Sequence, residues 1–189
     1  MIYFFIGSRA ALALIFVVAC ISKVQNSSSY REFFDSLKDF GLPSVLQRIV
    51  SLVVPAVEGL TLLLLVVNRT GLWGLVASAV LLSSFTAGIS VARARGRVVR
   101  CRCFGASDAP AEGGHVARNV ALLGIALAGI VTGLGAKGQL VSANVILAIG
   151  LGLITAALFL RWQELSFLLK SPSSPRSGSS HMPVNDQRS

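Results

Sequence analysis

The chain has 189 residues, of which 53% are hydrophobic and 13% are charged, and its formal net charge is +9. Soluble domains carry about 25% charged residues, so a chain with a mean hydropathy of +0.73 lacks the polar side chains to cover a soluble surface. These totals predict an integral membrane protein with one membrane domain, and they leave no room for a separate soluble enzyme.

The first predicted span covers residues 3–22, where Arg9 is the charged residue. A cleaved signal peptide is an alternative, but no lysine or arginine precedes Arg9 to form the positively charged start of such a peptide. Val17-Val18-Ala19-Cys20 also resembles a bacterial lipoprotein cleavage box, which would make Cys20 a lipidated N-terminus. We favour the span, because cleavage would export the basic residues that follow.

The stretch 27–47 is polar and mixed in charge, and Gly41-Leu42-Pro43 interrupts it. Large apolar side chains recur within it at helical spacing: Tyr30, Phe33, Phe34, Leu37 and Phe40. This pattern predicts a short amphipathic helix. Such a helix either lies in the membrane interface or packs against the bundle, and the pattern alone allows both.

Four further apolar segments are long enough to cross a hydrocarbon layer: residues 49–67, 72–92, 120–136 and 140–160. The resulting fold class is all-α, a polytopic membrane helix bundle of about five transmembrane helices plus a short amphipathic interfacial helix. We assign residues 1–165 to the transmembrane domain. Residues 166–189 are rich in serine and proline without apolar periodicity, and they predict a disordered tail.

Positive charge is distributed unevenly between the two sides of this bundle. Five spans place the segment after the first span, the segment 93–119 and the tail on one side, and these hold 14 of the 17 lysines and arginines. Arg69 and Lys137 fall on the other side. Because cytoplasmic segments retain positive charge, we expect a bacterial plasma membrane protein with its N-terminus outside and its C-terminus inside. The basic residues flank spans without an aromatic platform, so lipid and not nucleic acid is the expected partner.

Two cysteines stand one residue apart in the segment 93–119, each beside an arginine, as Arg100-Cys101-Arg102-Cys103. Neighbouring positive charge lowers the pKa of a thiol and favours the reactive thiolate. A disulfide closed across one residue is strained, and strained disulfides are reduced easily. We therefore predict that Cys101 and Cys103 are redox thiols, and that Arg100 and Arg102 stabilise their thiolate forms.

Other interpretations of the cysteines remain open. Cys101 and Cys103 are either inert residues in a basic segment or ligands of a metal ion together with His115, although a closed zinc site needs four ligands. The arginines can also serve topology alone. Cys20 is at the cytoplasmic end of the first span, where it would act as a resolving thiol or as an ordinary buried apolar residue.

Arg9 and Glu58 are charged residues inside predicted spans. A charge at the bilayer centre costs about 2.5–3.5 kcal/mol on insertion scales, so each needs a partner. Consecutive antiparallel helices would place Arg9 about seven residues from the outer end and Glu58 about nine, an offset of about 3 Å. We predict a buried Arg9–Glu58 ion pair, which either locks the two helices together or relays protons.

Several short motifs resemble those of the MauE family of methylamine-utilisation proteins, which belongs with the wider DoxX-like membrane proteins. The resemblance covers roughly residues 3–135 and is most specific at Cys101-Arg102-Cys103-Phe104-Gly105. The supporting motifs are Lys23, Phe40-Gly41-Leu42-Pro43, Pro55 with Glu58, Gly96-Arg97 and Arg118-Asn119.

The resemblance implies a role beside a thioredoxin-like partner in the processing, export or disulfide maturation of the methylamine dehydrogenase small subunit. Cys101 and Cys103 would exchange with that partner or with a quinone-linked system, although no motif here indicates a bound cofactor. Two alternatives stand beside this hypothesis. The first is a non-catalytic membrane assembly protein with incidental cysteines, and the second is a small transporter suggested by the intramembrane charges.

Overall fold

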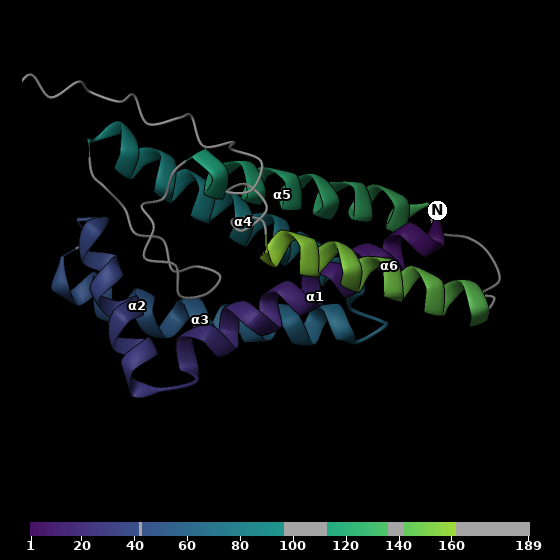
Figure 1. Ribbon diagram of the computed structural model, residues 1–189, viewed down its shortest axis with the longest axis horizontal. Helices are drawn as coiled ribbons and strands as arrows, with labels where there is room; N and C mark the ends of the chain where they lie inside the picture. The colour runs from purple at the N-terminus through teal and green to yellow at the C-terminus, as the bar shows by residue number, and fades with distance from the viewer. Residues whose placement is uncertain (42, 97–112, 136–141, 162–189) are drawn as a thin grey trace, which may run out of the picture.

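In a computed structural model, the described residues are 1–41, 43–96, 113–135 and 142–161, without the side chains of residues 113–115. These ranges contain helices and turns and no strand, which confirms the all-α class. The helices are α1 (Ile2–Val24), α2 (Ser27–Asp39), α3 (Ser44–Val66), α4 (Gly71–Ala94), α5 (Gly113–Leu134) and α6 (Ser142–Leu160) (Figure 1). Every helix but α2 is long and apolar enough to cross a membrane, α5 from Val116 onward, so the five predicted spans are confirmed.

Helix α1 runs through the middle of the bundle and packs against each of the other five helices (Figure 1). Its buried residues recur every three or four positions and form one stripe: Ser8, Ala11, Leu12, Ile15, Phe16, Ala19 and Lys23. Leu12, Ile15 and Phe16 are almost completely enclosed. The central place of α1 argues against the cleavage-box interpretation, because cleavage before Cys20 would remove the helix on which the others pack.

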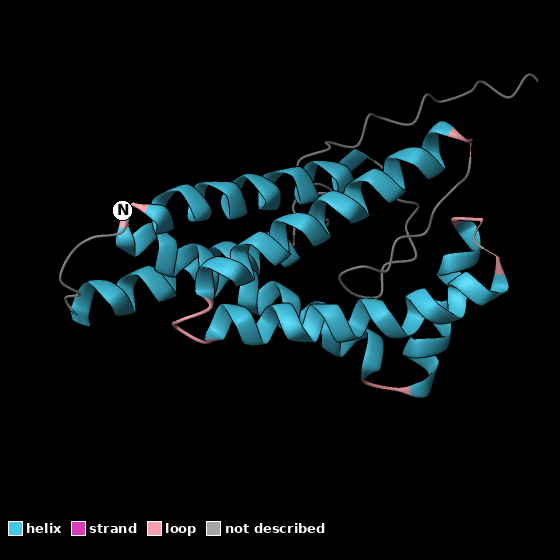
Figure 2. Cartoon of the chain, turned by 180° about the vertical axis from the view of Figure 1, so that it is seen from behind, coloured by secondary structure: helices cyan, strands magenta, loops and turns pink. Residues whose placement is uncertain are grey.

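The outer faces of the long helices expose large apolar side chains, for example Leu63 on α3 and Ile146 on α6. The five long helices run along the long axis of the molecule (Figure 2). An apolar surface this extensive would be a liability in water, whereas hydrocarbon solvates it. The fold is therefore that of a multi-pass membrane protein.

Two helices begin earlier than the hydropathy pattern predicted. Helix α3 starts at Ser44 and not at residue 49, and α5 starts at Gly113 and not at residue 120, so it begins inside the segment 93–119. The reason is that hydropathy marks the apolar part of a helix, while backbone hydrogen bonding continues through a polar first turn. The beginning of α5 therefore extends the bundle toward the cysteine segment.

Helix α2 is the predicted amphipathic helix, and its apolar side packs against the bundle. Phe33 and Leu37 are buried, and α2 contacts both α1 and α3. Just beyond its end, Phe40 packs against Ile89 and Ala92 of α4, and Val116 of α5 packs against the same two residues. Helix α2 thus covers one end of the bundle, where α4 ends and α5 begins.

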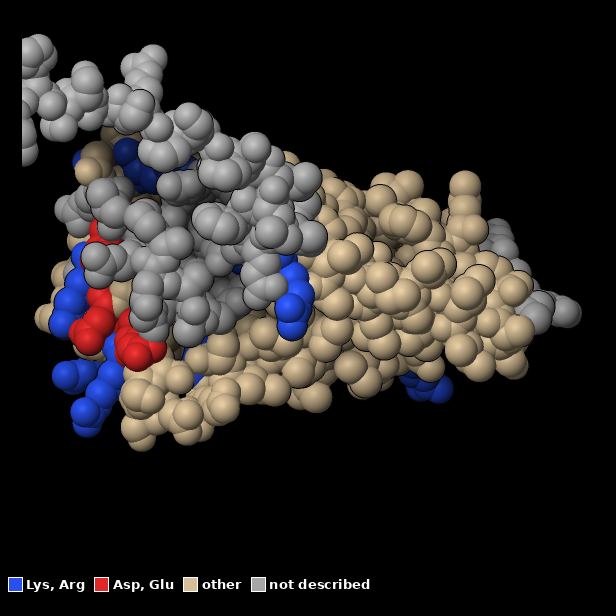
Figure 3. Space-filling view, viewed as in Figure 1, with Lys and Arg blue, Asp and Glu red and all other residues tan. Residues whose placement is uncertain are grey.

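Charged side chains gather at this same end. On the face drawn in Figure 3, most blue and red atoms lie at the end where α2 is located, and most of the remaining surface is uncharged. A long uncharged stretch beside a charged end fits the section that hydrocarbon surrounds.

Candidate functional site

A buried ion pair joins the C-terminal end of α1 to the middle of α3. The Lys23 Nζ donates to Glu58 Oε1 at 2.7 Å and to Oε2 at 2.9 Å, and the two side chains are 1% and 0% exposed. The ammonium group also donates to the Ala19 carbonyl at 3.2 Å, and it lies 5.5 Å from the centre of the Phe33 ring. Each proton of the ammonium group thus has an acceptor, as a charge removed from water requires.

The predicted ion pair between Arg9 and Glu58 is wrong. Glu58 binds Lys23, whereas the Arg9 guanidinium binds the turn after α3. Arg9 is level with Leu65–Asn68, which lie seven to ten residues beyond Glu58, or about 10–15 Å along the helix axis. The prediction failed because α1 extends past the end of α3, so residues equally far from their helix ends are not level with each other.

Arg9 instead donates hydrogen bonds to carbonyl groups at the C-terminal end of α3. Its Nε and Nη2 donate to the Leu65 carbonyl at 2.9 and 2.6 Å, and Nη2 donates to Val67 at 3.1 Å. The last carbonyls of a helix have no partner within it, and they carry partial negative charge that a cation stabilises. A Cβ atom at Gly71 would overlap Nε and Cζ of Arg9, so glycine leaves the space for this contact.

A hydroxyl pair connects α2 to α3 on the same side of the bundle. The hydroxyl oxygens of Tyr30 and Ser51 are 3.0 Å apart, and Ser51 is completely buried. The Ser51 hydroxyl donates to the Arg48 carbonyl at 2.9 Å, which leaves the Tyr30 hydroxyl as the donor to Ser51. This bond fixes α2 beside the Lys23–Glu58 pair, since Phe33 of α2 also contacts Lys23.

Cys20 lies one helical turn before Lys23. It is half-buried with a free thiol, and its Sγ donates to the Pro55 carbonyl at 3.9 Å. The contact joins α1 to the middle of α3. It places Cys20 in the packing between two helices, where the residue is partly buried.

The predicted redox residues Cys101 and Cys103, and the arginines Arg100 and Arg102, lie outside the described residues. The helices on either side of them are described. Ile89 and Ala92 of α4 pack with Val116 of α5, so α4 ends and α5 begins at the end of the bundle that carries α2.

Two polar residues that sequence analysis treated only as motif residues are buried at the start of α5. Arg118 is 6% exposed and Asn119 is 2% exposed. They follow the cysteine segment directly and lie on the inward side of the helix, with Leu122 and Ala126 one and two turns on. Burial of such residues in a span marks them as candidates for function.

The role of Lys23 was not predicted from the sequence, where we counted this residue among the basic residues flanking the first span. The position of Lys23 on the helix could have indicated that its side chain is buried. Lys23 continues the buried stripe of α1 four residues after Ala19, so it faces the bundle interior. Among the described residues, no cluster of three or more His, Cys, Asp and Glu could hold a metal ion.

Comparison with known proteins supports the motif resemblance. The family described as "Methylamine utilisation protein MauE" matches residues 1–132. A protein named "Methylamine utilization protein MauE" from Paracoccus denitrificans is 38% identical over 131 residues, which are 68% of this chain and 68% of that protein. No solved structure matches the fold. The matched region includes α1 to α4 and most of α5, whereas α6 lies beyond it.

Proposed function

The chain belongs to the MauE family of methylamine-utilisation proteins, and we propose that it serves methylamine utilisation as a membrane thiol-disulfide protein. In the proposed reaction, a dithiol of a client protein, such as the methylamine dehydrogenase small subunit before its export, attacks the Cys101–Cys103 disulfide. The client acquires a disulfide and Cys101 and Cys103 become thiols, so two electrons and two protons leave the client. A disulfide of a thioredoxin-like partner, or a quinone-linked system, then accepts these electrons and restores the Cys101–Cys103 disulfide.

The observation that best supports this proposal is the fixed position of the helices around the cysteine segment. The Tyr30–Ser51 bond ties α2 to α3 near the end of the bundle where α4 ends and α5 begins, and Phe40 packs against α4 there. The Lys23–Glu58 pair ties α1 to α3 further along α3. A reactive thiol pair is best attached to a rigid frame, because exchange requires that the attacking sulfur reach the partner disulfide in line.

Thiol trapping in membranes tests the proposal. Membranes are acid-quenched and labelled with a maleimide that adds mass, with and without prior reduction. We expect Cys101 and Cys103 to react fully only after reduction, and Cys103→Ser to accumulate a mixed disulfide that reductant removes. Cys20→Ser is the matched control, because it removes the chain's other thiol and should leave this behaviour unchanged. Cysteines that are fully reduced in untreated membranes, with no mixed disulfide in Cys103→Ser, would refute the redox role.

The second candidate function is that of a non-catalytic assembly protein. The buried Lys23–Glu58 pair favours it, because a fully satisfied ion pair between two helices is an ordinary structural device. This hypothesis predicts that Cys101→Ser with Cys103→Ser leaves growth on methylamine intact, while Glu58→Ala abolishes it. The redox proposal predicts that the double serine variant also loses growth. The transporter alternative gains no support, since Arg9 and Glu58 bind groups of the bundle itself.

A further inference from the structure

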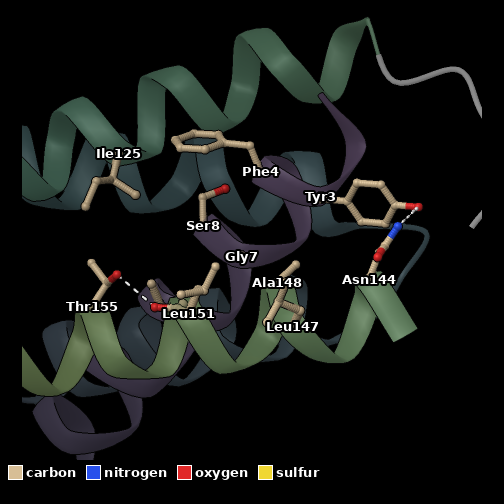
Figure 4. Close-up of a pocket in the computed structure, with 12 residues that line it drawn as sticks. Tyr3, Phe4, Gly7, Ser8, Ile125, Asn144, Leu147, Ala148, Leu151 and Thr155 are labelled. Atoms are coloured by element: carbon tan, nitrogen blue, oxygen red, sulfur yellow. Dashed lines mark hydrogen bonds between the residues drawn. The ribbon is translucent and has the colours of Figure 1, made fainter. Parts of the chain in front are cut away.

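A cleft opens on the side of the bundle between α5 and α6. Both helices pack against α1 but scarcely against each other, and the space between them has a volume of about 490 Å³ (Figure 4). Small residues of α1 form its floor, among them Gly7, Ser8 and Ala11. Leu147 and Leu151 of α6 form one wall, and both are largely exposed, so the cleft is continuous with the apolar outer surface.

The chemistry of this cleft is apolar except at one end. There the Asn144 Nδ2 donates to the Tyr3 hydroxyl at 3.4 Å (Figure 4). The other hydroxyls in the lining donate to carbonyls of their own helices: Ser8 to Phe5 at 3.0 Å and Thr155 to Leu151 at 2.8 Å. A ligand would therefore meet hydrogen-bonding groups at the Tyr3 end and hydrocarbon along the rest, which is the pattern that an amphiphile requires.

The volume of the cleft suits one lipid chain. Small-molecule sites range from about 300 to 1,000 Å³, which includes the 490 Å³ of this cleft. Polar groups at one end and an apolar lining along the rest match an amphiphile with a flexible hydrocarbon chain better than they match the apolar face of a helix from a second copy.

We propose that the cleft holds one acyl chain of a membrane phospholipid. The ester group of the lipid lies at the Tyr3–Asn144 end, where its carbonyl oxygens accept hydrogen bonds, and the chain extends over Gly7 and Ala11 toward Thr155. The bilayer supplies such chains directly through the lateral opening. Tyr3 and Lys23 are separated by 20 residues of α1, or about 30 Å, so this site is distinct from the cysteine end and exchanges no electrons with it.

Binding is tested by native mass spectrometry of the full chain in detergent, titrated with palmitoyl-oleoyl-phosphatidylcholine. The wild-type protein should bind one lipid saturably. Leu151→Trp fills the cleft and should weaken this binding about tenfold, because a few methylenes of the chain lose their contacts. Ile154→Trp is the matched control: Ile154 is on the same helix with similar exposure but outside the lining, and its variant should bind within about twofold of wild type.

Equal lipid binding by Leu151→Trp and Ile154→Trp would overturn the proposal, as would non-saturating binding to the wild-type protein. A dimer that Leu151→Trp abolishes would also overturn it, because a second copy would then be the occupant. If Leu151→Trp does not fold, Leu147→Phe fills the same cleft with a smaller change and is judged against the same control. The thiol-trapping result is independent of each of these outcomes.

Discussion

Lys23 and Glu58 are completely buried, so the contribution of each residue to the stability of the fold depends on the presence of the other. Removing water from two charges is costly, and their mutual attraction offsets the cost only while both are present. The Phe33 ring and the Ala19 carbonyl complete the surroundings of the ammonium group. The pair therefore makes the register between α1 and α3 specific, because a shift of either helix by one turn would leave a buried charge without its partner.

A double-mutant cycle at Lys23 and Glu58 measures this dependence. Lys23→Met and Glu58→Leu should each lower the free energy of unfolding by about 3–5 kcal/mol, while the double variant should recover most of the loss. The measurement is reversible unfolding in detergent. The matched control is the exposed pair of Lys38 and Asp35, 2.6 Å apart, where Lys38→Met should cost no more than about 0.5 kcal/mol. Additive losses at Lys23 and Glu58 would show that the two charges are not coupled.

Helices α1 and α6 approach each other closely because small residues face each other. A Cβ atom added to Gly152 would overlap the Gly7 carbonyl, and one added to Gly7 would come within 3.0 Å of the Ala148 carbonyl. Dispersion contacts between backbones replace the hydrophobic effect as the source of helix association in lipid. Close packing of complementary surfaces thus holds α6 against α1, and this contact also forms the floor of the cleft between α5 and α6.

Substitution of two glycines of α6 tests this contact between helices. Gly152→Ala should destabilise the protein by about 1–3 kcal/mol, because the added methyl forces α1 and α6 apart. Gly150→Ala is the control on the same helix, since nothing lies within 4 Å of its added Cβ, and it should be neutral or stabilising by up to about 1 kcal/mol. Melting temperatures in one detergent provide the comparison. Equal shifts for the two variants would contradict close packing at Gly152.

On the face drawn in Figure 3, charge is concentrated at one end of the molecule, and most of the described surface beyond it is uncharged. Helix α2 and the ends of α3, α4 and α5 that meet it form the charged end. The turn between α3 and α4, with Arg69, is at the opposite end beside Arg9. Because positive charge is retained in the cytoplasm, the end that carries α2 is expected to face inward.

Labelling with a membrane-impermeant maleimide tests this orientation. Cys101 and Cys103, reduced beforehand, should react in inside-out vesicles and remain protected in right-side-out vesicles. Arg69→Cys, in a variant whose three natural cysteines are serine, should show the reverse. If Cys101 and Cys103 react from outside, the charge-based orientation is inverted, and the thiols meet the exported client directly.

The sequence by itself determined the class of the fold, the five spans and the amphipathic helix, because each depends on local composition and periodicity. Twenty apolar residues form a helix in lipid whatever surrounds them, since their backbone groups have no other partners. The sequence motifs were likewise sufficient to predict the family, and the match to residues 1–132 confirms that prediction. The position of the cysteines in the segment before α5 also follows from the chain order alone.

The tertiary structure decided which residues meet. Arg9 and Glu58 were both identified as charges that need partners, but their partners depend on how far α1 extends past α3, and hydropathy carries no information on this offset. The central place of α1, the role of Gly71 beside Arg9 and the cleft between α5 and α6 depend on it as well. The physical reason is that spans are defined along one chain, whereas register between helices follows from side chains that fit across the space between them.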